Sequence, residues 1–407
     1  MLPLDLPGGV QLTGLPPLSL YVHVPWCVRK CPYCDFNSHE LRARITSATP
    51  TPGLDAALEG RYVQALLADL DTAAPSIWGR EVHSVFFGGG TPSLLSALAL
   101  DALMSGIRAR VRLMPQAEVT LEANPGTFEA EKFAAYRALG VNRLSIGVQS
   151  FDPARLQALG RIHDAREALR AVEIAHANFD NFNLDLMYAL PQQSLAGAEA
   201  DIRTAIQLGP PHLSAYHLTI EPNTAFARYP PPLPDDEMSA AMQESIEALL
   251  AGAGYVHYET SAFAQSGREC RHNLNYWQFG DYLGIGAGAH GKISSAGSIV
   301  RQVRWKHPRE YMDQALAGRA VQQEHAVAAA DLPFEFMMNA LRLIGGFHAA
   351  SFEQRTGLAL DVALPALGRA EVLGLVERDA QRVVPTLRGQ RFLNDLLQLF
   401  LPEAARD

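Results

Sequence analysis

Cysteine is scarce in this chain, whose 407 residues include four cysteines, three of them within positions 27–34. So few cysteines exclude the disulfide framework of a small secreted protein and indicate metal or redox chemistry in a reducing compartment. Apolar runs long enough to span a bilayer are lacking, and the first residues, MLPLDLPGG, lack the charged and apolar regions of a secretion signal. We therefore expect a cytoplasmic protein without a transmembrane segment.

An excess of basic residues is also lacking, since 34 Lys and Arg are outnumbered by 43 Asp and Glu, for a net charge of −9. A protein that binds nucleic acid irrespective of sequence needs a basic surface, so nucleic acid is not an expected partner. Hydrophobic residues make up 48% of the chain, which is enough for a large buried core.

Runs rich in β-branched and aromatic residues alternate with Ala- and Leu-rich stretches of helical period. Strand–helix units in series predict an α/β protein with a parallel sheet and helical crossovers, as in a barrel or partial barrel. The predicted strands are 18–24, 81–87, 117–123, 141–149, 182–188 and 212–220.

The second half of the chain has a different pattern. The proline run YPPPLPDD (229–236) predicts a linker or rigid turn, and YVHYETSAF (255–263) predicts a strand. Near the end, LVERDAQRVVP predicts a hairpin and RFLNDLLQLFL an amphipathic segment. We expect a barrel in residues 1–235, a connecting region in 236–324 and a winged-helix-like domain in 325–407.

Polar residues follow the predicted strands at the edge where chemistry collects in parallel barrels. The clustered cysteines follow the first strand, and GGGTP (88–92) follows the second. Polar groups in apolar strands cost stability unless they are satisfied or used. Their shared location therefore predicts a functional site. Besides the cysteines and glycines, the site contains Glu122, Asn124, Gln149 and Asp185.

Three thiolates in a Cys-x3-Cys-x2-Cys loop can ligate three corners of a [4Fe–4S] cluster and leave one iron open. The amino and carboxylate groups of S-adenosylmethionine (SAM) can chelate that iron, and an electron from the cluster can then split the sulfonium C–S bond. The alternative is a zinc site completed by His23 or Cys270, which this spacing fits badly. Tyr33 could cover the cluster, lie against an adenine or simply pack the loop.

The glycine run after the second strand allows backbone amides to approach a ligand closely. Next to the cysteine loop, it becomes a candidate cradle for the methionyl amine of SAM. Glu122, on the following strand, could hold the same group by a charge-assisted hydrogen bond.

With these residues together, the chain resembles the radical SAM superfamily and, within it, the coproporphyrinogen dehydrogenase-like group, with most similarity to the HemW heme chaperones. A CxxxCxxC motif by itself indicates only the superfamily, whereas a series of blocks in one order is specific. The blocks run from LSLYVHVPWC to LNDLLQLFL and include FFGGGTPSLL, EANPGT, RLSIGVQSF, LGRIH, FNLDLMYALP, LTIEPNT and HNLNYW.

The resemblance implies a partial (β/α)6 TIM-type barrel with a C-terminal winged-helix-like domain. It also implies that Cys27, Cys31 and Cys34 hold a [4Fe–4S] cluster. The residues implied to contact the SAM bound to that cluster are Tyr21, Gly89, Gly90, Thr91 and Glu122. In the porphyrinogen dehydrogenases, the positions matching Gln149, Arg161 and Asp185 contact a second SAM. Whether a second SAM binds here is left open.

Two departures from the dehydrogenases bear on the subfamily. The cysteine motif of the dehydrogenases continues with a fourth cysteine where this chain has Phe36. The dehydrogenases also carry an N-terminal segment before the first strand, whereas the first strand of this chain begins after only 17 residues. The HNLNYW block is associated with heme binding in the HemW family, which implies His272 as the heme ligand. Imidazole is a common axial ligand of heme iron, and Tyr276 and Trp277 offer flat apolar surface. The alternative is a buried histidine at a helix start.

Other residues near these motifs are weaker candidates. Cys270 is a second soft ligand or an idle buried thiol, and the glycine-rich GIGAGAHG (284–291) favours close backbone approach, with His290 as a candidate for polar contact.

Two functions are in competition, and a radical SAM enzyme acting on another tetrapyrrole is a third, weaker alternative. One is a heme chaperone that transfers heme to acceptor hemoproteins. If the acceptors are respiratory proteins in a membrane, the chaperone would contact the membrane only transiently. The other is oxygen-independent coproporphyrinogen III dehydrogenase, a radical SAM decarboxylation. We expect the chaperone; enzymatic activity and dimerisation are left open.

Overall fold

The computed structural model describes residues 10–41, 53–127 and 129–402. The N-terminal stretch MLPLDLPGG, which was expected not to be a secretion signal, lies outside the described residues.

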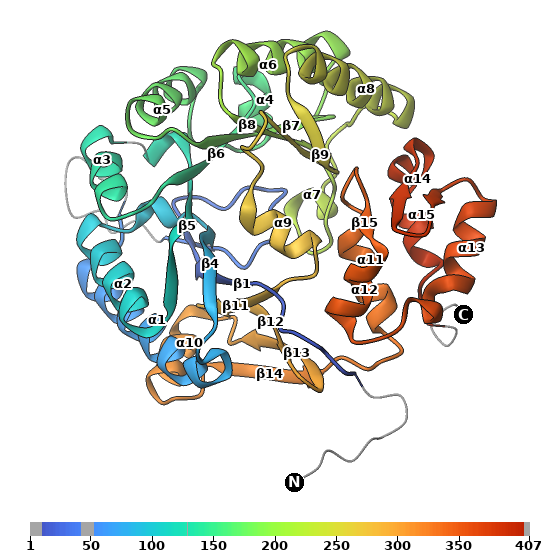
Figure 1. The fold of residues 1–407 in the computed structure, drawn as a ribbon. Helices are drawn as coiled ribbons and strands as arrows, with labels where there is room; N and C mark the ends of the chain where they lie inside the picture. The colour runs from blue at the N-terminus through green and yellow to red at the C-terminus, as the bar shows by residue number, and fades with distance from the viewer. Residues whose placement is uncertain (1–9, 42–52, 128, 403–407) are drawn as a thin grey trace.

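A curved sheet forms the body of the molecule, and seven of its strands are parallel, six of them forming the barrel in the order β1-β4-β5-β6-β7-β8 (Figure 1). The expected partial (β/α)6 barrel is therefore confirmed. Several of these strands are buried on both faces, as strands covered by helices on one side and a barrel interior on the other must be. Their bounds are β1 Leu18–Val24, β4 Glu81–Gly89, β5 Arg112–Ala123, β6 Arg143–Gln149, β7 Phe182–Tyr188 and β8 His212–His217.

The sheet continues beyond both edges of this barrel to a total of 12 strands. On one side β11 runs parallel to β1, and β12, β13 and β14 follow in antiparallel order. On the other side β10 and β9 pair antiparallel with β8 and with each other. These strands are β9 Val256–Glu259, β10 Ala262–Ala264, β11 Asp281–Ile285, β12 His290–Ser295, β13 Ser298–Arg304 and β14 Val321–Ala326.

The strand predicted for residues 255–263 was wrong in form, because a turn at Thr260 and Ser261 divides it into β9 and the start of β10. The predicted sixth strand also ends early, at His217, since Tyr216 and His217 are already exposed. The third strand begins earlier than predicted, at Arg112, where it pairs with Glu81 of β4.

Helices cover the outside of the barrel (Figure 1). Several begin at acidic or hydroxyl N-caps; α5, for example, has a complete capping box formed by Asp164 and Glu167. None of the described helices is long and apolar enough to cross a membrane. The outer helices are α1 Ala56–Ala73, α2 Ala97–Arg110, α3 Ala130–Ala138, α4 Pro153–Ala158, α5 Ala165–Asn178, α6 Leu195–Gln207, α8 Asp236–Gly252 and α10 Pro308–Leu316.

One short helix, α9 (Arg271–Trp277), lies inside the ring of strands (Figure 1). Its His272 ring stacks on the ring of Phe86 in β4, with centroids 4.1 Å apart. Glu118 of β5 accepts the first backbone N–H groups of the helix, from Arg271 at 3.1 Å and His272 at 3.2 Å. A buried carboxylate therefore caps α9 and fixes it against the interior wall of the barrel.

The C-terminal domain has a three-stranded sheet in the order β15-β17-β16 and a second hydrophobic core, to which Val10, Phe279 and Ile299 outside the domain also contribute. The predicted hairpin is β16–β17, and the final amphipathic tract is divided at Phe392 between α14 and α15. Its elements are α11 Leu332–Ala340, β15 Phe347–His348, α12 Ala349–Thr356, α13 Leu364–Val372, β16 Val376–Arg378, β17 Arg382–Pro385, α14 Leu387–Arg391 and α15 Leu393–Gln398.

This domain lies beside β9, on the open side of the barrel (Figure 1). Backbone hydrogen bonds join the two, from Thr260 N–H to the Arg342 carbonyl at 3.0 Å and from Ile344 N–H to the Tyr258 carbonyl at 3.1 Å. The smaller elements are β2 Trp26–Cys27, β3 His39–Glu40, α7 Ala225–Arg228 and the 3-10 turns η1 Ala74–Ile77, η2 Pro92–Leu94, η3 Pro125–Thr127 and η4 Leu360–Ala363.

Candidate functional site

The carboxyl ends of β1, β4 and β5 are level with one another, since Val24 pairs with Gly89 and Phe87 with Leu121. The cysteine loop leaves β1 at this edge, and the glycine run ends β4 beside it. The polar residues predicted from the strand ends therefore surround one region of the barrel.

Each cysteine of the loop has a polar neighbour, which for Cys27 and Cys31 comes from a distant part of the chain. The Thr91 hydroxyl donates to Cys27 Sγ at 3.5 Å, and Arg161 donates to Cys31 Sγ at 3.6 Å. The Cys34 thiol lies 3.7 Å from the Ser38 hydroxyl. All three cysteines are half-buried, and burial raises the pKa of Cys27 and Cys34.

The three loop sulfurs are spread more widely than the ligands of a single metal ion. Among the described residues, the one trio of His, Cys, Asp or Glu ligand atoms within 4.8 Å of one another lies elsewhere. His23 is not free to complete a zinc site, because its Nδ1 contacts the Tyr21 hydroxyl at 2.8 Å and its Nε2 the Asn37 carbonyl at 2.9 Å. Hydrogen-bond donors near the sulfurs are typical of iron–sulfur ligation. This donor set fits a cluster better than zinc.

The glycine run folds directly against the cysteine loop. Gly90 N–H donates to the Val24 carbonyl at 2.8 Å, and Thr91 N–H to the Trp26 carbonyl at 2.7 Å. A Cβ at Gly90 would lie 2.5 Å from the Trp26 carbonyl oxygen, and Gly89 has a positive φ of 112°. Only glycine therefore allows this close approach of the two segments.

Glu122 and Tyr21 lie at the same level. Gly89 N–H donates to Glu122 Oε2 at 3.0 Å. Desolvation, followed by the charge of Asp185, raises the pKa of Glu122 to about 8. Desolvation and the nearby Glu122 likewise raise the pKa of Tyr21. A carboxylate so destabilised in its charged form is suited to a cationic ligand group, which would favour ionisation.

Arg161 bridges the loop to the next strands. Its guanidinium donates to the Gly147 carbonyl at 2.7 Å and to the Asn124 side chain, while its Nε has no partner among the described residues. The Tyr33 ring packs near Phe226, with centroids 6.3 Å apart, and the Arg161 charge acts on the Tyr33 hydroxyl.

Gln149 and Asp185 complete this edge. Gln149 ends β6 with a positive φ of 70°, an unusual conformation for a residue other than glycine. Asp185 accepts hydrogen bonds from Ser145 at 2.9 Å and Asn183 at 2.8 Å, yet desolvation still raises its pKa. All the residues predicted for cluster and SAM binding thus lie at or near one edge of the barrel.

Asn37 was missed as a supporting residue. Its side chain donates to the carbonyls of Ala287 at 2.9 Å and Lys306 at 2.8 Å, which anchors the cysteine loop to the glycine-rich segment 284–291. That segment approaches closely, since a Cβ at Gly286 would lie 2.4 Å from the His23 carbonyl oxygen. His290 is exposed at the start of β12. A loop asparagine carries no periodic signal that could have revealed this contact.

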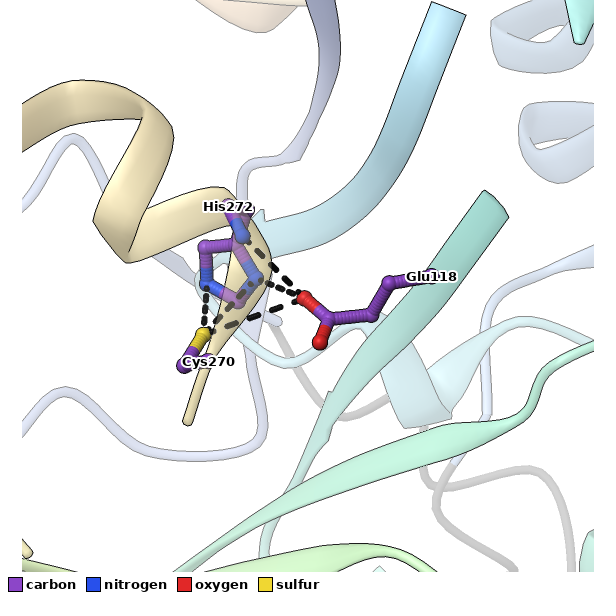
Figure 2. A group of neighbouring side chains, drawn as sticks. All are labelled: Glu118, Cys270 and His272. Atoms are coloured by element: carbon purple, nitrogen blue, oxygen red, sulfur yellow. Dashed lines mark hydrogen bonds and ion pairs between the residues drawn. The ribbon is translucent and has the colours of Figure 1, made fainter. Parts of the chain in front are cut away.

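His272 lies further from this edge, beside Phe86 of β4 and Glu118 in the middle of β5. It is buried and contacts Cys270 and Glu118 (Figure 2). Glu118 precedes Glu122 by four residues, which along a strand is about 13 Å. Cys270 therefore belongs with His272 rather than with the three loop cysteines. Glu118 was missed, although its place in a buried strand, at the same alternation as Glu122, was a usable indication.

Comparisons with known proteins agree with this architecture. The model of the radical SAM superfamily matches residues 21–205, and that of the HemN C-terminal domain matches residues 327–392. The solved structure of coproporphyrinogen III oxidase (HemN) from Escherichia coli, a radical SAM enzyme, covers 95% of this chain and 90% of its own with a TM-score of 0.79 and 24% identity. At that identity the similarity concerns the fold.

Curated relatives extend over nearly the whole chain. The heme chaperone HemW of Escherichia coli (strain K12) is 51% identical over 394 residues, which cover 96% of this chain and all of that protein. HemW of Bacillus subtilis (strain 168) is 33% identical, over 95% of this chain and 99% of its own. The resemblance seen in the sequence is confirmed: this chain belongs to the HemW heme chaperone family of the radical SAM superfamily.

Proposed function

We propose that this protein binds heme and delivers it to acceptor hemoproteins, and that it carries a SAM-liganded [4Fe–4S] cluster at the carboxyl ends of its barrel strands. The observation that carries the proposal is the 51% identity to a heme chaperone across the full length of that relative. Phe36, in place of the dehydrogenases' fourth cysteine, agrees with it.

In this proposal Cys27, Cys31 and Cys34 are the cluster ligands. Their support is a wide spacing of the sulfurs and hydrogen-bond donors at Thr91 and Arg161 that can stabilise thiolates. When bound, the cluster and SAM supply one-electron chemistry that the protein side chains lack.

The SAM-binding residues are Tyr21, Gly89, Gly90, Thr91 and Glu122, with Tyr33 beside the loop. The glycine backbone keeps this region free of side chains, and Glu122 provides the negative charge for an amino group. Gln149, Arg161 and Asp185 line the same edge and are proposed to face the same ligand site. The present hydrogen bonds of Arg161 and Asp185 to protein groups argue against a separate second SAM there.

His272 is the proposed heme ligand, and its burial sets a condition for binding. Only 4% of this residue is exposed. The cavity beside α9, about 290 Å³ and lined by Met114, Arg271 and Leu274, is at the lower limit of ligand pockets. A macrocycle can reach the imidazole only if α9 moves away from Glu118. Acceptors are proposed to be respiratory hemoproteins contacted transiently.

An anaerobic heme titration of the cluster-loaded protein tests the proposal. We expect a saturating Soret band at one heme per chain and an affinity at least tenfold weaker in His272→Ala. His325→Ala is the matched control, because His325 is an exposed histidine on β14, at the far edge of the sheet from α9.

Two other results would contradict this assignment. Equal heme affinity in wild type and His272→Ala would remove His272 as the ligand. Absence of a specific Soret band, together with protoporphyrinogen formation above a Cys31→Ala control, would replace the chaperone by the decarboxylating enzyme. Sedimentation of the heme-loaded protein would settle whether it dimerises.

A further inference from the structure

Three potential metal ligands converge at the N-terminal end of α9 (Figure 2). Glu118 Oε1 lies 3.0 Å from His272 Nδ1, and Cys270 Sγ lies 3.1 Å from the same nitrogen. The distance between Cys270 Sγ and Glu118 Oε1 is 3.8 Å. The three residues are almost completely buried, with exposed fractions of 6% for Glu118, 1% for Cys270 and 4% for His272.

These separations are close to those around a tetrahedral ion. Zinc bonds to oxygen, nitrogen and sulfur are about 2.0–2.3 Å long, so ligand atoms around zinc are about 3.3–3.8 Å apart. The distances within the trio differ from this range by only a few tenths of an ångström. A single ion therefore fits among the three atoms with small side-chain movements.

We propose that Glu118, Cys270 and His272 form a binding site for a divalent transition metal of the zinc type, separate from the cysteine loop. One carboxylate oxygen, one imidazole nitrogen and one sulfur make a mixed donor set suited to a borderline-soft ion such as Zn²⁺. Three protein ligands leave a fourth position for water or for a neighbouring hydroxyl. Tyr258 is placed nearby, since its hydroxyl accepts the Cys270 N–H at 3.2 Å.

The surroundings already orient the ligands. Glu118 is held by the N–H groups of Arg271 and His272, so its carboxylate has little freedom to rotate. Cys270 is the N-cap residue of α9, which turns its sulfur toward the ring two residues later. Fixed hydrogen-bond partners of this kind position metal ligands in proteins.

Binding of the ion releases one proton, and the two anionic ligands then offset the charge of the ion itself. In the metal-free site the charge of Arg143 acts on both Glu118 and Cys270, and burial raises the pKa of the Cys270 thiol. The entering ion forms a bond to Cys270 Sγ and displaces the thiol proton to solvent. His272 remains neutral, but its proton moves from Nδ1, where it is donated to Glu118, to Nε2, so that the Nδ1 lone pair can bind the ion. The ion then pairs with one carboxylate and one thiolate.

The site has a consequence for heme that rests on the proposed function. His272 cannot ligate zinc through a fixed Nδ1 inside the barrel and also be carried outward by α9 to a heme. Bound zinc would therefore hold α9 in place, and zinc and heme would exclude each other. Zinc binding itself does not depend on any role in heme transfer.

Cobalt titration of a full-length variant can isolate this site. Replacement of Cys27, Cys31 and Cys34 by Ala leaves Cys270 as the sole thiol of the chain. After metal removal with a chelator, we expect one equivalent of Co²⁺ to bind under anaerobic conditions. A thiolate-to-cobalt charge-transfer band should saturate at that ratio and disappear on addition of Zn²⁺.

Further substitutions in that background identify the ligands. Cys270→Ala should abolish the band, and Glu118→Gln and His272→Ala should each weaken Co²⁺ binding at least tenfold, whereas His325→Ala, at an exposed position on β14, should leave it unchanged. Circular dichroism and thermal unfolding check that each variant is folded. Failure of the folded parent to show the band would overturn the site, as would full-affinity binding by Glu118→Gln and His272→Ala. Heme binding is measured separately, by titration of the wild type. The metal site and the proposed heme binding can therefore be contradicted independently of each other.

Discussion

Two glutamates on one strand have opposite electrostatic surroundings. Burial by itself raises the pKa of Glu118, but the hydrogen bond from His272 and the charge of Arg143 outweigh it and lower this pKa to about 2. Glu122 has a single N–H donor and the charge of Asp185 nearby, and its pKa is about 8. The neighbours of Glu118 therefore keep it ionised in the metal-free protein, whereas Glu122 needs a cationic ligand group to favour its ionised form.

Glu122 should make the cofactor-free protein less stable at high pH. Its folded pKa exceeds the ordinary value of 4.5, so its contribution to stability is complete below pH 4.5 and is lost as the pH rises through about 8. Glu122→Gln should reduce the fall in unfolding free energy between pH 5 and pH 9 by about 4 kcal/mol. Urea unfolding at both pH values, under reducing conditions, measures the difference.

The same variant should bind SAM at least tenfold more weakly, because the proposed partner of the amino group loses its charge. Glu377→Gln, at an exposed position in the C-terminal domain, is the control for both measurements. Identical pH dependence in Glu122→Gln and wild type would show that Glu122 is ionised at its ordinary pKa.

At the scale of the elements, the strands of the barrel could be predicted because their apolar runs are nearly continuous. β14 gave no such indication, since VQQEHA is almost wholly exposed and its strand conformation depends on pairing with β13. The turn at Thr260 could not be predicted for a similar reason, because the Thr260 N–H donates to the Arg342 carbonyl in the distant C-terminal domain.

The candidate site for the cluster and SAM could likewise be predicted from the sequence in part. Cysteines and glycines close to strand ends are visible in the chain, and the parallel topology brings them to one edge. The position of His272 could not be predicted, because it depends on a hydrogen bond to Glu118, 154 residues away. Pairings of this kind are made by tertiary packing and leave no local pattern.

Gly90→Ala should separate the glycine run from the cysteine loop. The added Cβ would lie 2.5 Å from a backbone oxygen, that of Trp26, which cannot rotate away. We expect a loss of about 2 kcal/mol in unfolding free energy and lower iron retention per chain after anaerobic reconstitution. Gly297→Ala is the control, because a Cβ there meets nothing within 4 Å. Unchanged iron content and stability would show that the two segments need not approach so closely.

At the scale of the whole molecule, the C-terminal domain is attached to the barrel by a bidentate ion pair. Arg391 of α14 donates to both carboxylate oxygens of Glu247 in α8, at 2.6 and 2.7 Å. Each side chain is 23% exposed, so water screens the pair only in part. The pair thus helps to keep the domain beside the open side of the barrel.

Arg391→Ala should loosen this attachment at a cost of about 1 kcal/mol. We expect faster proteolytic release of the C-terminal domain, because the connection opens more often. Arg378→Ala removes an ion pair to Glu371 inside the same domain, at 2.9 Å, and controls for the loss of an arginine. Equal cleavage rates in the two variants would mean that the Arg391 pair contributes nothing to docking.

The contacts of Asn37 bear on the order in which the protein can mature. A ribosome completes the cysteine loop early, but the carbonyls that anchor it belong to Ala287 and Lys306, and the second neighbour of β1 is β11. During synthesis the loop therefore remains without these anchors until about three-quarters of the chain has emerged. A cluster bound before that point would therefore sit in a loop that lacks the support it has in the folded protein.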